Sequence, residues 1–220
     1  MKTVKVWDIF IRVFHWSLVA SIIIQIITAE SFKKVHVNVG YFIIILFLTR
    51  LVWGFIGSKH ARFADFIYPP HEIFGYLKGI LKGNPKHYVG HNPAGGAMVF
   101  TMLFFLLLTT MAGLKTLGAE GKGPLADFPI RIVNEAHANG DRDNSHADQE
   151  DHDGRKYNRE DRNGHDKDGK KEHLWKEIHE FLVGIIIFLI VIHICGVIVS
   201  SYLHKENLIR AMFTGEKNLG

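Results

Sequence analysis

The sequence predicts an all-α membrane protein, in which four transmembrane helices form a bundle and one long charged loop lies outside the membrane. The first observation behind this prediction is the distribution of apolar residues. The mean hydropathy is only +0.08, yet long apolar runs alternate with a strongly polar insert, so the average hides two kinds of segment. The second observation is that the 220 residues include 14 histidines, some of them inside the apolar runs. The fold class therefore follows from the pattern and not from the overall composition.

Four apolar segments are long enough to cross a bilayer, since about 30 Å of hydrocarbon requires roughly 20 residues of helix. A buried helix of a soluble protein is the alternative for any one segment, but four such lengths in one chain favour membrane spans. No small-x-small cleavage site follows the first segment, so we expect it to be a retained span and not a signal peptide. The expected spans are Ile9–Thr28, Val37–Ile56, Ala97–Leu117 and Phe181–Leu203.

Positive charge sets the expected orientation, because loops rich in lysine and arginine remain in the cytoplasm. Four spans place both termini on one side, together with the loop 58–96. The short loop on the opposite side carries only Lys33 and Lys34. We therefore expect a bacterial inner-membrane protein with both termini in the cytoplasm. The basic residues on the side of the termini are Lys2, Lys5, Lys59, Arg62, Lys78, Lys82, Lys86, Lys205, Arg210 and Lys217, with Arg12 and Arg50 near the adjacent span ends.

Two segments outside the spans have distinct compositions. Pro69–Gly83 combines aromatic and aliphatic residues with lysines at helical spacing, which is typical of a short helix on the membrane surface; a soluble surface helix is the alternative. Asn139–His173 is almost wholly charged or turn-forming and cannot bury enough apolar surface to fold alone. The expected organisation is thus 1–118 with three spans, 119–178 as a disordered periplasmic loop, and 179–220 with the fourth span and a cytoplasmic tail.

Four histidines lie in or at the edges of the spans, where ionisable side chains are costly and usually functional. His179 and His193 are 14 residues apart, so on one helix their rings share nearly the same face, about 21 Å apart along the axis. His15 lies in the first third of a span that starts in the cytoplasm, and His36 lies where the second span leaves the outer side. Matching the depths pairs His15 with His193 near the cytoplasm and His36 with His179 near the outer surface.

Two neutral imidazoles from facing helices suit the axial positions of a haem iron. The alternatives are a hydrogen bond to a neighbouring helix for each histidine, and contact with interfacial water for His36 and His179. Arg12 and Arg50 are candidates for contacts with haem propionates, with ordinary positive-inside anchoring as the alternative. The single Cys195 excludes an intramolecular disulfide and a thiolate zinc cluster, and the sequence has no C-x-x-C-H motif for covalent haem.

Six stretches of the chain resemble a known family. They are VWDIFIRVFHW (6–16), VHVNVGY (35–41), RLVWGFIGSKHARFADF (50–66), HNPAGGAM (91–98), EIHEFLVGI (177–185) and HICGVIVSSYLHKENLIRAMFTG (193–215). With these motifs the chain resembles the bacterial cytochrome b561 family, which includes the b-type cytochrome subunits of nickel–iron hydrogenases; membrane subunits of formate dehydrogenases are similar in design. The resemblance covers nearly the whole chain apart from the charged insert. It implies a four-helix bundle with two b haems, whose iron ligands are His15, His36, His179 and His193.

The resemblance also implies electron exchange between a quinone pool and a partner outside the membrane. We therefore expect an electron-transfer subunit of an oxidoreductase, and not a stand-alone enzyme. Its expected partners are the lipid bilayer, a quinone or quinol, and a periplasmic c-type cytochrome or redox enzyme subunit, with no nucleic acid; a homo-oligomer stays open. We expect the quinone at the cytoplasmic end, near Arg12, Arg50 and Ser200–Leu208.

Two other functions remain open from the sequence. The first is a membrane protein that binds zinc, nickel or copper through its histidine-rich loop, since imidazoles and carboxylates suit such ions. No fixed i, i+4 ligand spacing is evident in the loop, and a solvated tether that keeps a partner close is the simpler interpretation. The second is a direct quinol:oxygen or quinol:superoxide oxidoreductase, which needs a quinone site on the outer face. The loop histidines are His137, His146, His152, His165 and His173.

Overall fold

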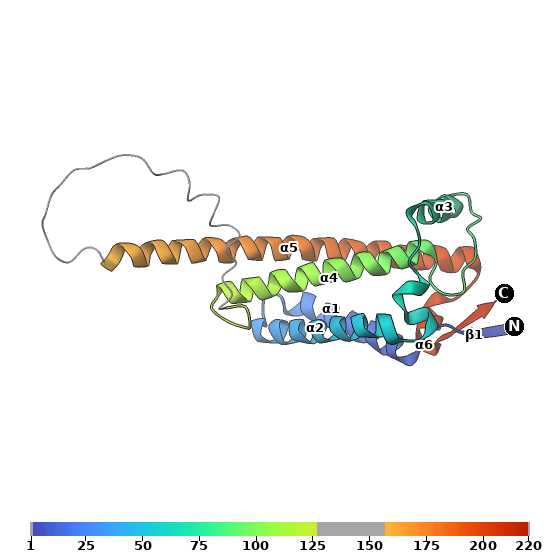
Figure 1. Cartoon of the computed structure of the whole chain (residues 1–220), viewed down its shortest axis with the longest axis horizontal. Helices are drawn as coiled ribbons and strands as arrows, with labels where there is room; N and C mark the ends of the chain where they lie inside the picture. The colour runs from blue at the N-terminus through green and yellow to red at the C-terminus, as the bar shows by residue number, and fades with distance from the viewer. Residues whose placement is uncertain (1, 127–156, 220) are drawn as a thin grey trace, which may run out of the picture. The chain divides into compact units, whose positions relative to one another are not determined.

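The computed structural model describes residues 2–126 and 157–219 of the chain. Within these residues, four helices are long and apolar enough to cross a membrane, which confirms the predicted spans (Figure 1). The first helix has the predicted bounds, and the other three extend beyond them. These helices are α1 (Ile9–Thr28), α2 (Lys33–Ile56), α4 (Pro93–Ala119) and α5 (Tyr157–His204).

Helix α5 begins inside the segment that the sequence assigns to the charged loop. Ion pairs one turn apart stabilise these polar turns: Nδ1 of His173 lies 3.4 Å from Oε1 of Glu177, and Nζ of Lys176 lies 3.9 Å from Oε1 of Glu180. Charged residues of alternating sign can thus continue a helix that starts as an apolar span. Residues 127–156 of the loop predicted over 119–178 lie outside the described residues, and 157–178 of that segment belong to α5.

The chain forms two compact units, Met1–Thr110 with Phe181–Gly220, and Met111–Glu180. All four long helices contribute to the core of the first unit, where Ile43, Leu106 and Ile186 are buried and Leu18 packs against them. Large apolar side chains cover the outside of the same helices, as expected for surfaces that face lipid. Examples are Ile9, Phe55, Phe181 and Phe188, which are all well exposed.

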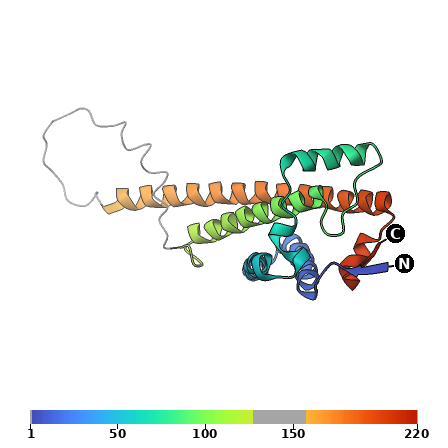
Figure 2. The ribbon, with the colours of Figure 1, turned by 45° about the vertical axis from the view of Figure 1, so that its right-hand side comes forward.

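The two ends of the chain pair with each other in the first unit. Strand β1 (Lys2–Lys5) runs antiparallel to β2 (Glu216–Leu219), with Lys2 opposite Leu219 and Lys5 opposite Glu216. The short helix α6 (Leu208–Thr214) precedes β2, and Gly215 has a φ of 83°, which lets the chain turn sharply between them. We call the end of the bundle with β1, α6 and β2 the terminal end (Figures 1 and 2).

A loop and a short helix complete the terminal end. Two 3₁₀ turns, η1 (Lys59–Ala61) and η2 (Phe63–Asp65), follow α2, and helix α3 (Pro70–Leu81) lies in the segment predicted for a surface helix. Helix α3 buries Tyr76 and exposes the apolar side chains of Phe74 and Leu81, as expected for a helix that lies on a membrane surface.

Two glycines let this loop pack closely against the helices. A Cβ on Gly54 of α2 would lie 2.1 Å from the ring of Phe63, and a Cβ on Gly96 of α4 would lie 2.4 Å from the carbonyl oxygen of Phe66. Side chains at these positions would therefore push the loop away from α2 and α4. The close fit sets Phe63 beside Arg50, one of the predicted site residues.

Candidate functional site

His15 of α1 and His193 of α5 belong to the first unit and lie within electrostatic range of each other. Both side chains are partly buried. The Nδ1 atom of His15 is inaccessible to water and has no hydrogen-bond partner among the described residues. The structure thus brings together the two histidines that depth matching pairs near the cytoplasm, as the resemblance also implies.

Arg50 of α2 is buried, with only 4% of its surface exposed. Its guanidinium carbon lies 4.8 Å from the centre of the Phe63 ring, and Nη1 has no hydrogen-bond partner within the described parts of the chain. The carboxylate of Asp8 interacts with Arg50 electrostatically. The arginine therefore keeps an unused donor in a protected position.

Asp8 joins the start of α1 to the end of α2. Its carboxylate caps α1 by accepting a hydrogen bond from the backbone nitrogen of Ile11 (2.8 Å), and it also accepts from Trp53 Nε1 (3.0 Å) and the Ser58 hydroxyl. Burial acts to raise the pKa of this carboxyl, but these hydrogen bonds and the charge of Arg50 hold it below its ordinary value. Asp8 is therefore an anion that fixes the region around Arg50.

His91 lies between two aromatic rings just before α4. Its ring centre is 4.6 Å from that of Trp7 and 4.4 Å from that of Phe66. Desolvation, followed by the charge of Arg50, lowers the pKa of His91 to about 3, although Asp65 opposes the shift. Nδ1 of His91 is inaccessible to water and has no partner among residues 2–126 and 157–219. The ring is therefore a neutral imidazole with one unused nitrogen.

Acid is expected to destabilise the terminal end through His91. An unfolded histidine takes up a proton near its ordinary pKa of 6.5, whereas folded His91 resists protonation until about pH 3. The stability from the neutral ring is therefore complete above about pH 6.5 and is lost progressively as the pH falls towards 3. Melting temperatures at pH 7.5 and pH 5 check this: the wild type should lose more than His91→Gln. An equal loss in both proteins would contradict the prediction.

Arg12 holds α1 to the C-terminal segment. Its Nη1 donates to the carbonyl oxygen of Phe213, and one turn later Trp16 Nε1 donates to the carbonyl oxygen of Met212 (3.3 Å). The Nε atom of Arg12 is buried and lacks a partner in the described part of the chain. Nη1 of Arg12 thus holds the C-terminal segment, whereas Nε is available to a bound group.

The nitrogen atoms left without partners fit an iron porphyrin with its propionates. Two are imidazole nitrogens, on His15 and His91, and two belong to the guanidinium groups of Arg12 and Arg50. Imidazole nitrogen is an iron ligand in haem proteins, and guanidinium pairs with carboxylates. Buried polar atoms are normally satisfied, and these four nitrogens, which lack partners among the described residues of the first unit, fit a group with both chemistries.

His36 lies in the first turn of α2. Its Nδ1 is 3.2 Å from the carbonyl oxygen of Gln25, which belongs to the last turn of α1, where carbonyls lack partners within the helix. A proton donated from Nδ1 to this carbonyl leaves the lone pair on Nε2, the arrangement usual for a metal-bound histidine. Gly40, one turn later, leaves room for the Gln25 side chain, since a Cβ there would lie 3.3 Å from Nε2 of Gln25.

His179 lies on α5 in the second unit, against Gly113 of α4. A Cβ on Gly113 would lie 3.1 Å from Cε1 and 3.3 Å from Nδ1 of the His179 ring. Gly113 therefore leaves the space that this imidazole needs. His36 and His179 belong to different units, so their predicted pairing stays a prediction.

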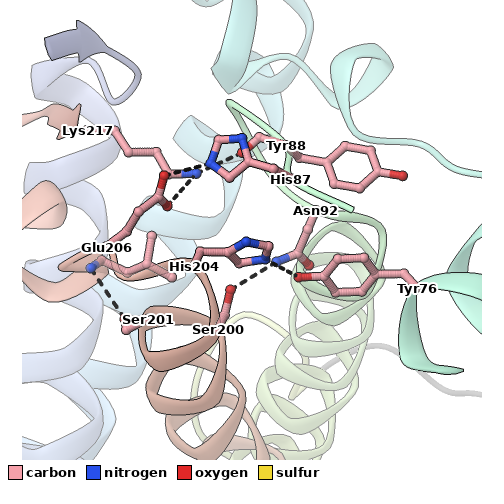
Figure 3. A network of polar contacts seen from close by, with 10 residues as sticks. Tyr76, His87, Tyr88, Asn92, Ser200, Ser201, His204, Glu206 and Lys217 are labelled. Atoms are coloured by element: carbon pink, nitrogen blue, oxygen red, sulfur yellow. Dashed lines mark hydrogen bonds and ion pairs between the residues drawn. The ribbon is translucent and has the colours of Figure 1, made fainter. Parts of the chain in front are cut away.

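A group of charged residues at the terminal end is buried in the protein (Figure 3). Nζ of Lys217 lies 2.8 Å from Oε2 of Glu206 and donates to the carbonyl oxygen of Tyr88 (2.7 Å). Nε2 of His87 lies 2.7 Å from the other oxygen of Glu206. This group joins the end of α5, the loop before α4 and strand β2.

Several of these residues have no signal in the sequence that would select them. Gly113 and Lys217 become important only through contacts with distant parts of the chain. His91 lies inside the motif HNPAGGAM, and its position just before a span is a signal that could have selected it. Asp8 precedes the first apolar run, as an N-cap residue does.

The structure describes one of the five histidine side chains of the charged insert, that of His173. His137, His146 and His152 lie outside the described residues, and so does the side chain of His165. His173 is described, and it pairs with Glu177. Among the described residues, no group of three or more histidine, cysteine, aspartate or glutamate side chains could hold a metal ion.

Comparison with known proteins gives one family and several curated relatives. A family model described as prokaryotic cytochrome b561 matches residues 6–215. A probable Ni/Fe-hydrogenase B-type cytochrome subunit of Bradyrhizobium diazoefficiens is 30% identical over 156 residues, which cover 55% of this chain and 60% of that protein. The subunit with the same name in Azotobacter vinelandii is 29% identical over 152 residues, covering 54% of this chain and 61% of that protein.

A third relative with this name, from Rhodobacter capsulatus, is 25% identical over 154 residues, which cover 55% of this chain and 57% of that protein. The chain thus spans about three fifths of the length of the curated relatives it matches. No solved structure matches the chain.

Proposed function

The chain belongs to the prokaryotic cytochrome b561 family, and on this basis we propose that it is a di-haem b-type cytochrome of a bacterial inner membrane. It carries electrons between the quinone pool and a redox partner on the periplasmic side. The observation that carries the proposal is that His15 and His193, from the first and last spans, lie within electrostatic range of each other in one unit. The same unit has imidazole and guanidinium nitrogens without hydrogen-bond partners among the described residues.

The four histidines would hold the haems in two pairs. His15 and His193 serve the haem near the terminal end, and His36 and His179 serve the other. The contact of His36 with the Gln25 carbonyl supports ligation through Nε2, and the small Gly113 beside His179 supports a ring position that must be kept clear. Helix α5 would then contribute one ligand to each haem, His193 to one and His179 to the other.

When bound, each haem supplies a one-electron redox couple, and the side chains of the chain set the conditions for it. Two imidazoles would hold each iron, so the haems would carry electrons and would not bind oxygen or peroxide. Arg12 and Arg50 have guanidinium nitrogens that would donate to propionate oxygens and offset their charge, and the neutral His91 ring would donate a hydrogen bond without adding charge. The apolar core around Ile43 and Ile186 excludes water from the space between the helices.

The proposed orientation has the terminal end in the cytoplasm. The pairing of β1 with β2 supports a topology in which both termini lie on one side, and the basic residues of that side favour the cytoplasm. We place the quinone at this end, near Arg12, Arg50 and Ser200–Leu208. The curated relatives are named as subunits of a hydrogenase, so the proposed periplasmic partner is a redox enzyme subunit or a c-type cytochrome.

The test of this function is the haem content of the purified full-length protein. We expect the dithionite-reduced spectrum to show the α band of a b-type cytochrome, and a pyridine haemochrome assay to give two haems per chain. A protein without the α band would contradict the cytochrome function itself. One haem per chain would retain the cytochrome but contradict the two-pair arrangement.

Deleting Asn139–Lys171 is expected to leave both haems bound and to slow electron exchange with the partner, because this charged segment serves as a tether outside the membrane. Haem content and the rate of partner reduction, measured on the same preparation, check both parts. A Gly/Ser segment of the same length in its place separates the effect of charge from that of length. Loss of haem on deletion would show that the segment is part of the bundle.

A further inference from the structure

A series of polar side chains leads inward from the surface at the terminal end (Figure 3). It begins at His87, whose side chain is 43% exposed. Its neighbours Glu206 and Lys217 are only 4% and 7% exposed. The ion pair between them balances their charges, and the contact between Glu206 and His87 orients an imidazole that is open to water on one side.

The series continues from His87 towards the helices. The ring centres of His87 and His204 lie 5.3 Å apart at an angle of 74°, so the two imidazoles contact each other edge to face. Nε2 of His204 lies 3.3 Å from the hydroxyl of Tyr76. The Tyr76 hydroxyl is in turn within hydrogen-bond reach of Ser200, so groups that exchange protons follow one another from the surface to α5.

The inner part of the series is protected from water. Tyr76 is 4% exposed and Ser200 is 7% exposed, and burial raises the pKa of the Tyr76 hydroxyl, which keeps its proton. The amide nitrogen of Asn92 lies 3.5 Å from the Ser200 hydroxyl, and Oδ1 of Asn92 accepts a hydrogen bond from the backbone nitrogen of Gly95 (2.7 Å), which caps α4. The last hydroxyl is therefore held in place between α4 and α5.

The position of Ser200 connects this series with the proposed haem site. Ser200 follows His193 by seven residues on the same helix, which is two turns, or about 10 Å along the axis. The stretch Ser200–Leu208 also borders the place proposed for the quinone. An ion pair alone would suffice to hold the C-terminal segment, so the partly buried imidazole of His204 and the buried hydroxyls between it and Ser200 need a different explanation.

We propose that His87, His204, Tyr76 and Ser200 form a proton route between cytoplasmic water and the quinone. The inference rests on the proposed function. Reduction of a quinone to a quinol adds two electrons, supplied through the haems, and two protons; oxidation of the quinol returns both. Each imidazole takes a proton on one ring nitrogen and releases one from the other, and each hydroxyl accepts and donates.

The charged and titratable groups around this route come from four elements. Glu206 and Lys217 face His87 and His204 from the end of α5 and from β2, Tyr88 contacts Tyr76 from the loop before α4, and Tyr76 itself lies on α3. Glu206 is a positioning residue, because it holds the His87 ring through its Oε1. The route therefore begins at the exposed His87 ring, which Glu206 holds in one orientation, and ends at the buried hydroxyls of Tyr76 and Ser200.

The experiment is stopped-flow reduction of the haems by decylubiquinol in the purified full-length protein. We expect His204→Gln and Tyr76→Phe to lower the limiting rate about tenfold or more, the usual scale of a lost proton-transfer group, with an unchanged apparent affinity for the quinol. Reduction by dithionite, which needs no proton transfer, should stay at the wild-type rate. His87→Ala should be slow, and imidazole added to the buffer should restore its rate.

His71→Gln is the matched control, because His71 is an exposed histidine on α3; it should behave as the wild type. Wild-type rates in His204→Gln would overturn the route, and so would an equal slowing with dithionite, which would indicate a structural role. A wild-type protein that binds haem but is not reduced by decylubiquinol would instead overturn the proposed quinone reaction, and the route with it.

Discussion

His193→Ala is expected to lower the haem content from two to one per chain and to roughly halve the α band of the reduced protein. The substitution removes one axial ligand of the haem proposed near the terminal end, and His15, the other ligand, lies within electrostatic range of His193. His15→Ala should give the same loss for the same reason. The midpoint potential of the remaining haem, measured by redox titration, identifies which one is retained.

The matched control for this experiment is His173→Ala. His173 lies on the same helix, and its side chain is 74% exposed, so its replacement should leave both haems bound. His193→Met is a second variant, because a thioether can take the axial position and raises the potential of a haem iron. Loss of the other haem in His193→Ala, with the one at the terminal end retained, would show that the pairs are wrong.

Gly113→Leu is expected to remove or weaken the haem held by His179. A Cβ at this position already lies 3.1 Å from the imidazole, so a branched side chain must displace the ring, and overpacking of this kind costs roughly 1–3 kcal/mol. Gly113→Ala requires the ring to move by only a few tenths of an ångström and should give a smaller loss. Haem content, together with the amount of protein inserted in the membrane, checks the effect.

Gly169→Leu introduces the same side chain into the same unit at a place where a Cβ meets no described atom within 4 Å. It should therefore keep the wild-type haem content. If Gly113→Leu also kept two haems, His179 would have room to spare and its role as a ligand would be in doubt. Selective loss of the haem at the terminal end would contradict the assignment of His179 to the other pair.

The spans were predictable because a membrane helix depends mainly on local composition and length. α1 has the predicted bounds of Ile9–Thr28, and the other spans differ only at their ends. The extra turns of α5 were not predictable from apolar residues, because ion pairs between charged residues continue the helix. The pairing of His15 with His193 was predicted by counting residues along two spans of opposite direction, and the structure places the two histidines within electrostatic range of each other.

The residues that surround these histidines were harder to find. Lys217 and Arg50 both enter the charge count that predicts the orientation, yet the structure buries them. Lys217 is paired with Glu206, and the guanidinium of Arg50 lies against the face of the Phe63 ring. Such contacts join residues on different elements, and a single sequence carries no local signal for them. The role of Gly113 likewise becomes visible only in the structure, where it leaves space for the His179 ring.

The pairing of β1 with β2 has a consequence for how the protein is made. Lys2–Lys5 leaves the ribosome before the four spans, and Glu216–Leu219 leaves it after them, so these strands can pair only once every span has been synthesised. Lys217 reaches Glu206 at the same moment. Until then Glu206 lacks its lysine and β1 is an open strand edge. Strand β2 therefore completes the terminal end only after all the membrane helices have been made.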